Sequence, residues 1–242
     1  MKKAFIQLVA VGLMLIAQSA FAQCPSARDR NLILTDGMAD VTGQNDSAKV
    51  SVAVVTRGRN LEQVSSENAD KTKSVIQAIK DLNIKDLKLK TSDYRVTPQR
   101  DYKARPPKIN GYEVHNAIEI TLEGFDPEPL SKNISMMIGK ALESGSNTIN
   151  LIQFYIKDKS ALEKQALKQS TRQAMDRAKT LAEAAGVKLK RMVSLSTQPI
   201  HIPTRQHMLR AAGMKTEALA APPIEIGESQ IRVQVSIAYE IE

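Results

Sequence analysis

The stretch GYEVHNAIEITLEG, residues 111–124, decides the fold. Apolar and polar side chains alternate along it, which predicts a β-strand with one face in the core and the other toward solvent. The apolar face consists of Tyr112, Val114, Asn116, Ile118, Ile120 and Leu122, and the polar face of Glu113, His115, Glu119 and Thr121. We therefore expect a mostly antiparallel sheet that is covered on one side.

Asn116 interrupts the apolar face of this strand. A buried amide that forms no hydrogen bond destabilises a protein, so Asn116 needs a partner. Two interpretations follow: Asn116 ties the sheet to a neighbouring loop, or it contacts a ligand. In the second case, Tyr112 and the loop 100–110 would lie near the binding site.

On the N-terminal side, the pattern predicts a strand around 50–54, a helix within 60–85 and a second strand at 86–98, followed by a loop at 99–111. The predicted helix has one face built at three- and four-residue steps. That face consists of Leu61, Val64, Asn68, Thr72, Val75, Ile79 and Leu82.

On the C-terminal side, residues 126–145 predict a helix with Asp126 as N-cap, Pro127 at the first position and Gly145 as the stop. Residues 147–156 are apolar on both faces, which predicts a central strand. A helix over 160–186 follows, and its predicted buried face consists of Leu167, Ser170, Ala174, Ala178, Leu181 and Ala185. Strands are predicted at 187–197 and, with the most regular alternation in the chain, at 229–242.

The order of elements from 50 to 156 is β-α-β-β-α-β, as in ferredoxin-like folds. A helix and two strands recur after residue 160. We expect an α+β fold, mostly antiparallel sheet with long helices packed against it, built from pseudo-duplicated β-α-β-β units. Residues 23–242 would form a single domain with sub-units 33–125 and 126–242, and 199–228 would be a long loop.

Residues 1–22 have the features of a cleaved secretory signal peptide. Two lysines precede an apolar run that is too short to span a bilayer, and small residues stand at the cleavage positions. Removing two lysines and no acids lowers the formal charge from +8 to +6. We therefore expect a periplasmic protein, with outer-membrane association left open, and nucleic acid is a poor partner for an exported chain.

Cys24 is the only cysteine and would stand just after the cleavage site. It cannot form a disulfide within one chain, so it could be a free thiol, an interchain link or a lipidation site. Gln23 precedes it where lipidation needs a small residue, which disfavours lipidation. Nothing nearby in the sequence would lower its pKa, so a redox role is not expected.

Hydrolytic, metalloprotease, P-loop and dinucleotide-binding motifs are absent from the sequence, and we expect no enzyme and no cofactor. His201 and His207 lie near two methionines, but their spacing is not typical of a metal site. Lys164, Lys168 and Arg172 form a stripe at four-residue steps. A solvated helix face and contact with anionic envelope lipids are both consistent with this stripe.

The mature chain resembles the SIMPL-domain family, which includes bacterial periplasmic immunogenic proteins and oxidative-stress defence proteins. The matching pieces, in order, are DVTGQND (40–46), ENADKTKSVIQAIKDLNIKDLKLKTSDYRVTPQ (67–99), INGYEVHNAIEITL (109–122), GSNTINLIQFYI (145–156), QAMDRAKTLAEAAGVKLKRMVSLS (173–196) and PPIEIGESQIRVQVSIAYEI (222–241). The chain departs from the family where Asn45-Asp46 replaces a frequent Pro-Asp, and where Ile226-Gly227-Glu228 replaces Pro-Gly-Glu.

The resemblance implies an exported envelope protein without established catalytic residues, and it implies that some members form large rings. We therefore expect a non-enzymatic, self-assembling homo-oligomer with an indirect role in envelope or oxidative stress. The alternative is a monomeric or dimeric binding module for a lipid, peptide or small stress metabolite.

Overall fold

The computed structural model describes residues 31–200 and 223–242. The predicted signal peptide, Cys24, His201 and His207 lie outside these described residues, as does most of the predicted loop 199–228. The described residues form three helices and seven strands in two antiparallel sheets. This confirms the predicted α+β class.

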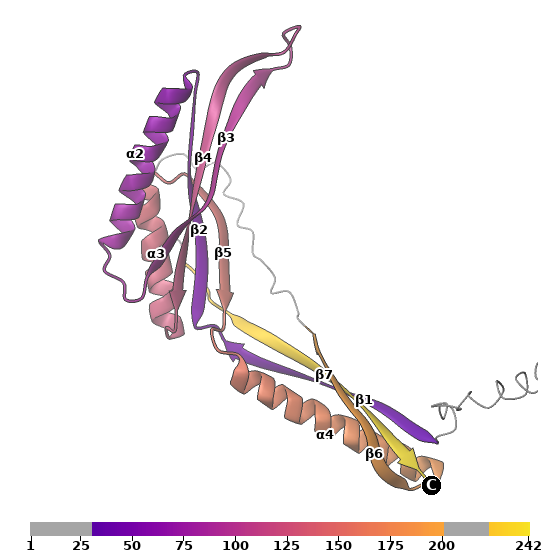
Figure 1. Cartoon of the computed structure of the whole chain (residues 1–242). Coiled ribbons are helices and arrows are strands. Elements are labelled where there is room, and N and C mark those ends of the chain that lie inside the picture. The colour runs from indigo at the N-terminus through magenta and orange to yellow at the C-terminus, as the bar shows by residue number, and fades with distance from the viewer. Residues whose placement is uncertain (1–30, 201–222) are drawn as a thin grey trace, which may run out of the picture.

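The larger sheet has the strand order β3-β4-β2-β5, and every neighbouring pair is antiparallel. Helices α2 and α3 lie on one face of it (Figure 1). The bounds are β2 Ser47–Gly58, α2 Leu61–Lys80, β3 Lys88–Asp101, β4 Lys108–Glu123, α3 Pro127–Glu143 and β5 Thr148–Tyr155. The β-α-β-β-α-β order that the sequence predicts for this region is confirmed.

The smaller sheet has the order β1-β7-β6 and is covered by one long helix, α4. Its bounds are β1 Leu32–Gln44, α4 Ser160–Ala185, β6 Leu189–Ile200 and β7 Glu228–Ile241. β1 and β7 pair continuously from Leu32↔Glu240 to Gln44↔Glu228. The smaller sheet therefore combines the first described strand with the last two strands, and Figure 1 shows it continuing the larger sheet at an angle.

Each sheet has its own hydrophobic core. The larger core lies between β2, β4 and the two helices, and its fully buried members include Ile79, Ile118, Ile120, Leu122, Leu130, Ile134 and Ile138. Each such side chain contributes about 1.5–3 kcal/mol by leaving water. The smaller core has fewer buried members, which are Val41, Ala166, Ala174, Val233, Val235 and Ile237. Small residues dominate its helix side, so α4 lies close to the sheet.

At Gly37 of β1, the backbone of α4 comes very close to the smaller sheet. A Cβ atom at Gly37 would lie 1.9 Å from the Ser170 carbonyl oxygen and 2.6 Å from the Ala174 nitrogen. The buried row of α4 is Ala166, Ser170, Ala174, Ala178 and Ala182. The predicted face is therefore wrong at Leu167, Leu181 and Ala185, which are exposed. The row that packs against the sheet consists of small residues, because only small side chains fit against Gly37.

β5 is an edge strand, so the prediction that it is central is wrong. It pairs with β2 alone, and no second described strand lies along its other edge. Ile152 packs in the larger core, while most other side chains of β5 are only half-buried. The apolar residues on both faces, which led to the prediction, are therefore not explained by burial within one chain.

The ends of α3 follow the predicted signals only in part. Asp126 occupies the N-cap position, but its side chain forms no capping hydrogen bond, and Pro127 begins the helix. Gly145 follows with a φ of +117°, a conformation that side chains rarely adopt, and so ends the helix as predicted. The loop between β3 and β4 is shorter than predicted, because these strands extend to Asp101 and start again at Lys108.

Candidate functional site

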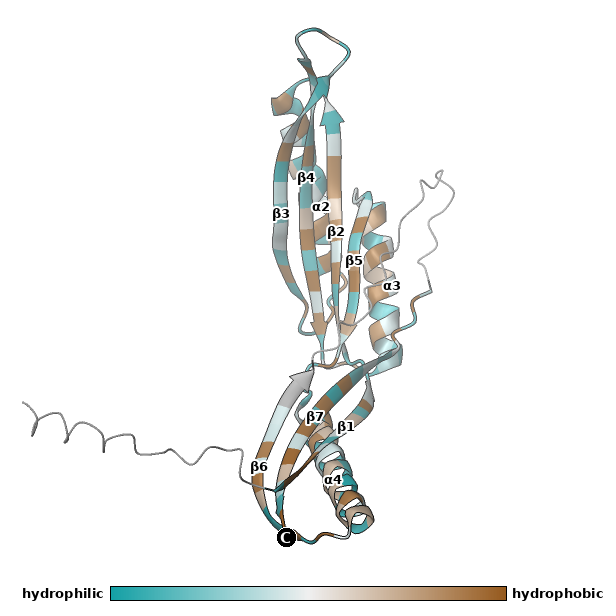
Figure 2. Ribbon diagram, turned by 90° about the vertical axis from the view of Figure 1, so that its right-hand side faces the viewer, coloured by the Kyte–Doolittle hydropathy of each residue, from teal (hydrophilic) through white to brown (hydrophobic). Residues whose placement is uncertain are grey.

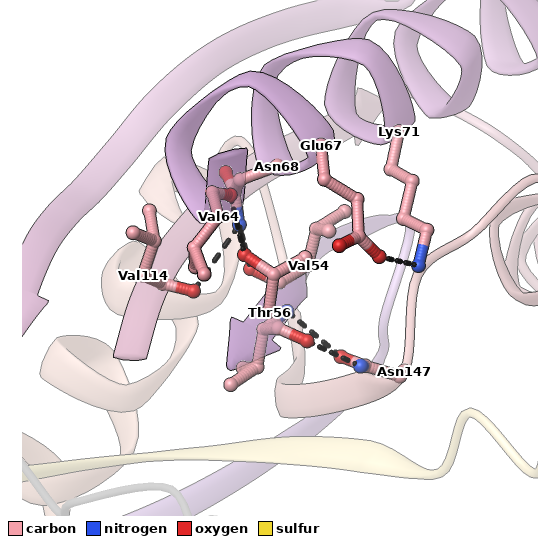
Figure 3. A network of polar contacts seen from close by, with 9 residues as sticks. Val54, Thr56, Val64, Glu67, Asn68, Lys71, Val114 and Asn147 are labelled. Carbon is pink, nitrogen blue, oxygen red and sulfur yellow. Dashed lines mark hydrogen bonds and ion pairs between the residues drawn. The ribbon is translucent and has the colours of Figure 1, made fainter. Parts of the chain in front are cut away.

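Asn68 is the centre of a buried polar network between α2 and the larger sheet (Figure 3). Its Nδ2 lies 2.9 Å from the Val54 carbonyl, 3.1 Å from the Val114 carbonyl and 3.2 Å from Thr56 Oγ1. Thr56 Oγ1 in turn donates to the Val64 carbonyl at 3.0 Å. This network anchors the helix to two adjacent strands, which is a structural role.

Tyr112 and Asn116 lie on β4 as predicted, with their side chains half-buried. Asn116 is paired in register with Val54 of β2 and Tyr94 of β3. Its Oδ1 atom is buried and accepts no hydrogen bond from any residue that the structure describes. The side chain of Tyr94 is 55% exposed beside it. The amide that ties a helix to the sheet is therefore Asn68, while Asn116 retains an unused acceptor.

His115 lies on the opposite face of β4, as the alternation predicts, and its side chain is 16% exposed. Its Nδ1 atom is 3.4 Å from Asp93 Oδ2, without the geometry of a hydrogen bond. The same carboxylate oxygen forms an ion pair with Arg95, at 2.8 Å from Nε. Asp93 is thus shared by a guanidinium and an imidazole.

Glu123, at the end of β4, lies close to two lysine side chains on the face of the larger sheet that α2 and α3 do not cover. Its carboxylate lies 2.8 Å from Lys88 Nζ and 3.5 Å from Lys157 Nζ, and it accepts from the Tyr155 hydroxyl at 3.1 Å. The bond from Lys88, followed by that from Tyr155, lowers the pKa of Glu123 to about 2. Burial, followed by the bond to Glu123, raises the pKa of Tyr155 to about 12. These contacts link β3, β4 and β5 to Lys157, which lies in the segment between β5 and α4.

Asn45 and Asp46 join the two sheets. The buried Asn45 amide donates to the carbonyls of Ile226 and Gly227, at 3.1 and 3.2 Å, and its Oδ1 accepts from Ser229 Oγ at 2.6 Å. Asp46 Oδ1 accepts from the Lys157 backbone N–H at 2.8 Å. The turn between β1 and β2 is therefore bonded both to the start of β7 and to the segment that enters α4.

The predicted basic stripe lies on the solvent side of α4. Lys164, Lys168 and Arg172 are all exposed. Arg172 also lines an open groove of about 800 Å³ between α4 and β1, together with the exposed side chains of Leu34 and Leu181. The stripe is sterically available to an anionic surface.

Two α4 side chains cap the outer edge of β1 beside this groove. Gln173 Oε1 accepts from the Met38 backbone N–H at 2.6 Å, and Arg177 Nη1 donates to the Asp36 carbonyl at 2.6 Å. These bonds occupy backbone groups that another strand would otherwise use.

Within residues 31–200 and 223–242, no group of three His, Cys, Asp or Glu side chains is placed to hold a metal ion. No helix in the same ranges is long and apolar enough to cross a membrane. Asn45, Asn68 and Glu123 are polar centres that were not predicted from the sequence as sites. Asn68 carried a detectable signal, because it falls on the apolar face of its predicted helix.

The class that these features define is an α+β protein with two helix-backed antiparallel sheets joined by a polar junction. The family described as "SIMPL: Protein of unknown function (DUF541)" matches residues 33–239. The chain belongs to the SIMPL family, which confirms the resemblance seen in the sequence.

Two relatives carry the name "26 kDa periplasmic immunogenic protein", one from Brucella melitensis biotype 1 and one from Brucella abortus strain S19. Each is 26% identical to this chain over 222 residues, which is 87% of this chain and 84% of the relative. Both names place the relatives in the periplasm, and neither name describes an enzyme.

A solved structure, AtUAH in complex with (S)-hydroxyglycine, matches 58% of this chain and 35% of its own with 14% identity and a TM-score of 0.25. This likeness is too weak to support an argument.

Proposed function

We propose that this protein is an exported, non-enzymatic cell-envelope protein that assembles into homo-oligomers in the periplasm. The signal-peptide features of residues 1–22 and the periplasmic relatives support the location. A role in envelope or oxidative stress would be indirect, since the lone Cys24 has no second cysteine with which to cycle.

The observation that carries the proposal is the exposure of large apolar side chains on edge strands. On β3, Tyr94 is 55% exposed and Val96 is 41% exposed. On β6, Leu195 is 57% exposed, and Met192 is exposed beside it. Monomeric proteins normally keep apolar side chains of this size covered, so they provide a surface on which another copy can dock. Association between copies would remove this surface from water.

Light scattering coupled to size-exclusion chromatography of the mature protein, with and without reductant, tests the proposal. We expect one defined particle of several chains whose mass does not change with reductant, because packing rather than Cys24 would hold it together. A monomer at micromolar concentration would contradict self-assembly. A dimer that reductant dissociates would instead assign the contact to Cys24.

A second candidate is a binding module for a lipid, peptide or small stress metabolite, and the unused acceptor of Asn116 favours it. A ligand N–H or O–H group could bond to Oδ1, with Tyr94 and Tyr112 providing aromatic surface. Native mass spectrometry of protein purified from the envelope tests this candidate. A co-purifying small molecule that is lost in Asn116→Leu supports it, and a bare chain in the wild type opposes it.

A further inference from the structure

β5 has the composition of a central strand but lies at the edge of its sheet. Its eight residues, Thr148–Tyr155, include no charged residue and no proline. Figure 2 shows β3, β4, β2 and β5 side by side, with β5 at the margin. Natural proteins usually protect such edges, because their unpaired backbone N–H and C=O groups can form hydrogen bonds with a strand of another chain.

The other three edges in the described sheets are protected. β3 carries Lys88, Lys90 and Pro98, and its register shifts twice against β4. β6 carries Lys190, Arg191 and Pro199, and it also shifts twice against β7. The edge of β1 is capped by side chains of α4. Charges, prolines, bulges and covering groups are the usual means of preventing edge pairing.

The unprotected edge is also confined to β5. Where β2 extends past β5, Asn147 occupies the position that a longer strand would fill. Its Oδ1 accepts from the Val55 N–H at 2.9 Å, and its Nδ2 donates to the Val55 carbonyl at 2.7 Å. Along β5 itself, one register shift near Asn150 leaves the regular segment Leu151–Tyr155.

We propose that β5 is the contact strand of the assembly, pairing antiparallel with β5 of a second copy across a twofold axis. This inference rests on the proposed self-assembly and names the edge that performs it. A twofold axis normal to the sheet places identical strands antiparallel, and an uncharged strand meets itself without repulsion. The larger sheets of two chains then form one continuous sheet, in which β5 is a central strand. Larger particles need a second contact in addition.

Charge placed on β5 tests the proposal. Gln153 lies opposite Lys49 within the chain, so Gln153→Glu is compatible with the monomer, and Asn150 is exposed. In the mature protein we expect Asn150→Glu/Gln153→Glu to reduce the particle mass by about twofold or more, because like charges then meet across the axis. Gln63→Glu/Ser66→Glu on the exposed side of α2 is the control, with the same added charge at the same sequence spacing, and should leave the mass unchanged.

A crosslink tests the same contact if the charged variant does not fold. In a Cys24→Ser background, Asn150→Cys/Gln153→Cys should form interchain disulfides on mild oxidation, since paired strands bring Cα atoms within about 5.5 Å. The two cysteines are about 10 Å apart along one strand and cannot bridge within it.

The outcomes separate the two proposals. A wild-type oligomer whose mass survives the β5 charges and that forms no crosslink would overturn the β5 contact and leave self-assembly intact. A monomeric wild type would overturn both.

Discussion

Asn45 and Gly227 are bonded twice, although 182 positions separate them in the chain. The backbone N–H and the side-chain amide of Asn45 both donate to the Gly227 carbonyl, at 3.5 and 3.2 Å. A proline at position 45 could form neither bond, because it has no backbone N–H and no side-chain amide.

Asn45→Ala should therefore destabilise the junction between the sheets. The change removes the partner of the Ser229 hydroxyl and of the Ile226 carbonyl and leaves the Gly227 carbonyl with only the backbone N–H of residue 45, which costs about 1–3 kcal/mol of unfolding free energy. Urea unfolding of the mature protein measures this loss. The control is Gln44→Ala at the exposed neighbouring position, which should unfold at the same urea concentration as the wild type. Equal unfolding midpoints for Asn45→Ala and Gln44→Ala would refute the role of Asn45.

Gly37→Ala should loosen α4 from the smaller sheet. The added methyl group would overlap the backbone of α4 at Ser170 and Ala174, and rigid backbone cannot yield as a side chain can. We expect a loss of about 2 kcal/mol or more in unfolding free energy. Chemical denaturation measures it, with the exposed Thr42→Ala on the same strand as control. Wild-type stability of Gly37→Ala would show that the helix packs less closely than described.

Glu123 should make stability depend on acid pH. Its pKa of about 2 in the folded protein is below the ordinary value of 4.5, so its contribution is full above about pH 4.5 and is lost as the pH falls toward 2. Glu123→Gln should flatten the stability profile in this window. Thermal melts between pH 2 and 7 measure the effect. The control is Glu67→Gln, which removes an exposed ion pair with Lys71 on α2, 2.6 Å long in the wild type. Stability profiles of identical shape for the wild type and Glu123→Gln would contradict the assignment.

Lys164→Gln/Lys168→Gln/Arg172→Gln should abolish any binding to vesicles containing phosphatidylglycerol. The stripe is exposed, so the variant should keep wild-type stability to within about 0.5 kcal/mol. Binding of the wild type should weaken with added salt, because the attraction would be electrostatic. Vesicle sedimentation gives the readout, with Lys179→Gln on the same helix as control. If the wild type does not sediment even at low salt, the stripe is a solvated helix face.

Asn116→Leu should stabilise the protein. The amide oxygen is buried without a donor in the described structure, and replacing an unpaired acceptor by an apolar group of similar size removes its desolvation cost, about 1–3 kcal/mol. Thermal and urea unfolding of the ligand-free protein test this. Asn133→Leu, at a half-buried position of α3, is the control for added apolar surface. A clear loss of stability in Asn116→Leu would show that the oxygen has a partner.

The elements of this fold are largely readable from the sequence, because amphipathic periodicity is local. The alternation of apolar and polar residues along β4 and β7 matches their buried and exposed faces in the structure. The buried residues of α2, Val64, Asn68, Thr72, Val75 and Ile79, all lie on its predicted face. The partners of strands are not local. Nothing in residues 32–44 specifies that β1 pairs with the last strand of the chain rather than with β2.

The errors have physical causes of the same kind. In α4, steps of three and four residues allow two neighbouring rows, and only the close approach at Gly37 selects the alanine row over Leu167 and Leu181. For β5, apolar residues on both faces predict a central strand whether the second neighbour belongs to the same chain or to another. Asn116 lies on the inner face of the sheet, as the alternation predicts. Whether its amide oxygen finds a hydrogen-bond donor depends on the position of α2, which is not a local property of the sequence.

The pairing of β1 with β7 has a consequence for how the chain is completed. Residues 47–156 form the larger sheet from one uninterrupted segment, so this part has all its strands early in synthesis or translocation. The smaller sheet cannot form until β7 has been synthesised, because β1 pairs with β7. A chain cut short by a dozen residues would keep one well-packed half and leave β1 without a partner. Folding of the smaller sheet therefore requires both ends of the described fold, β1 and β7, to be present.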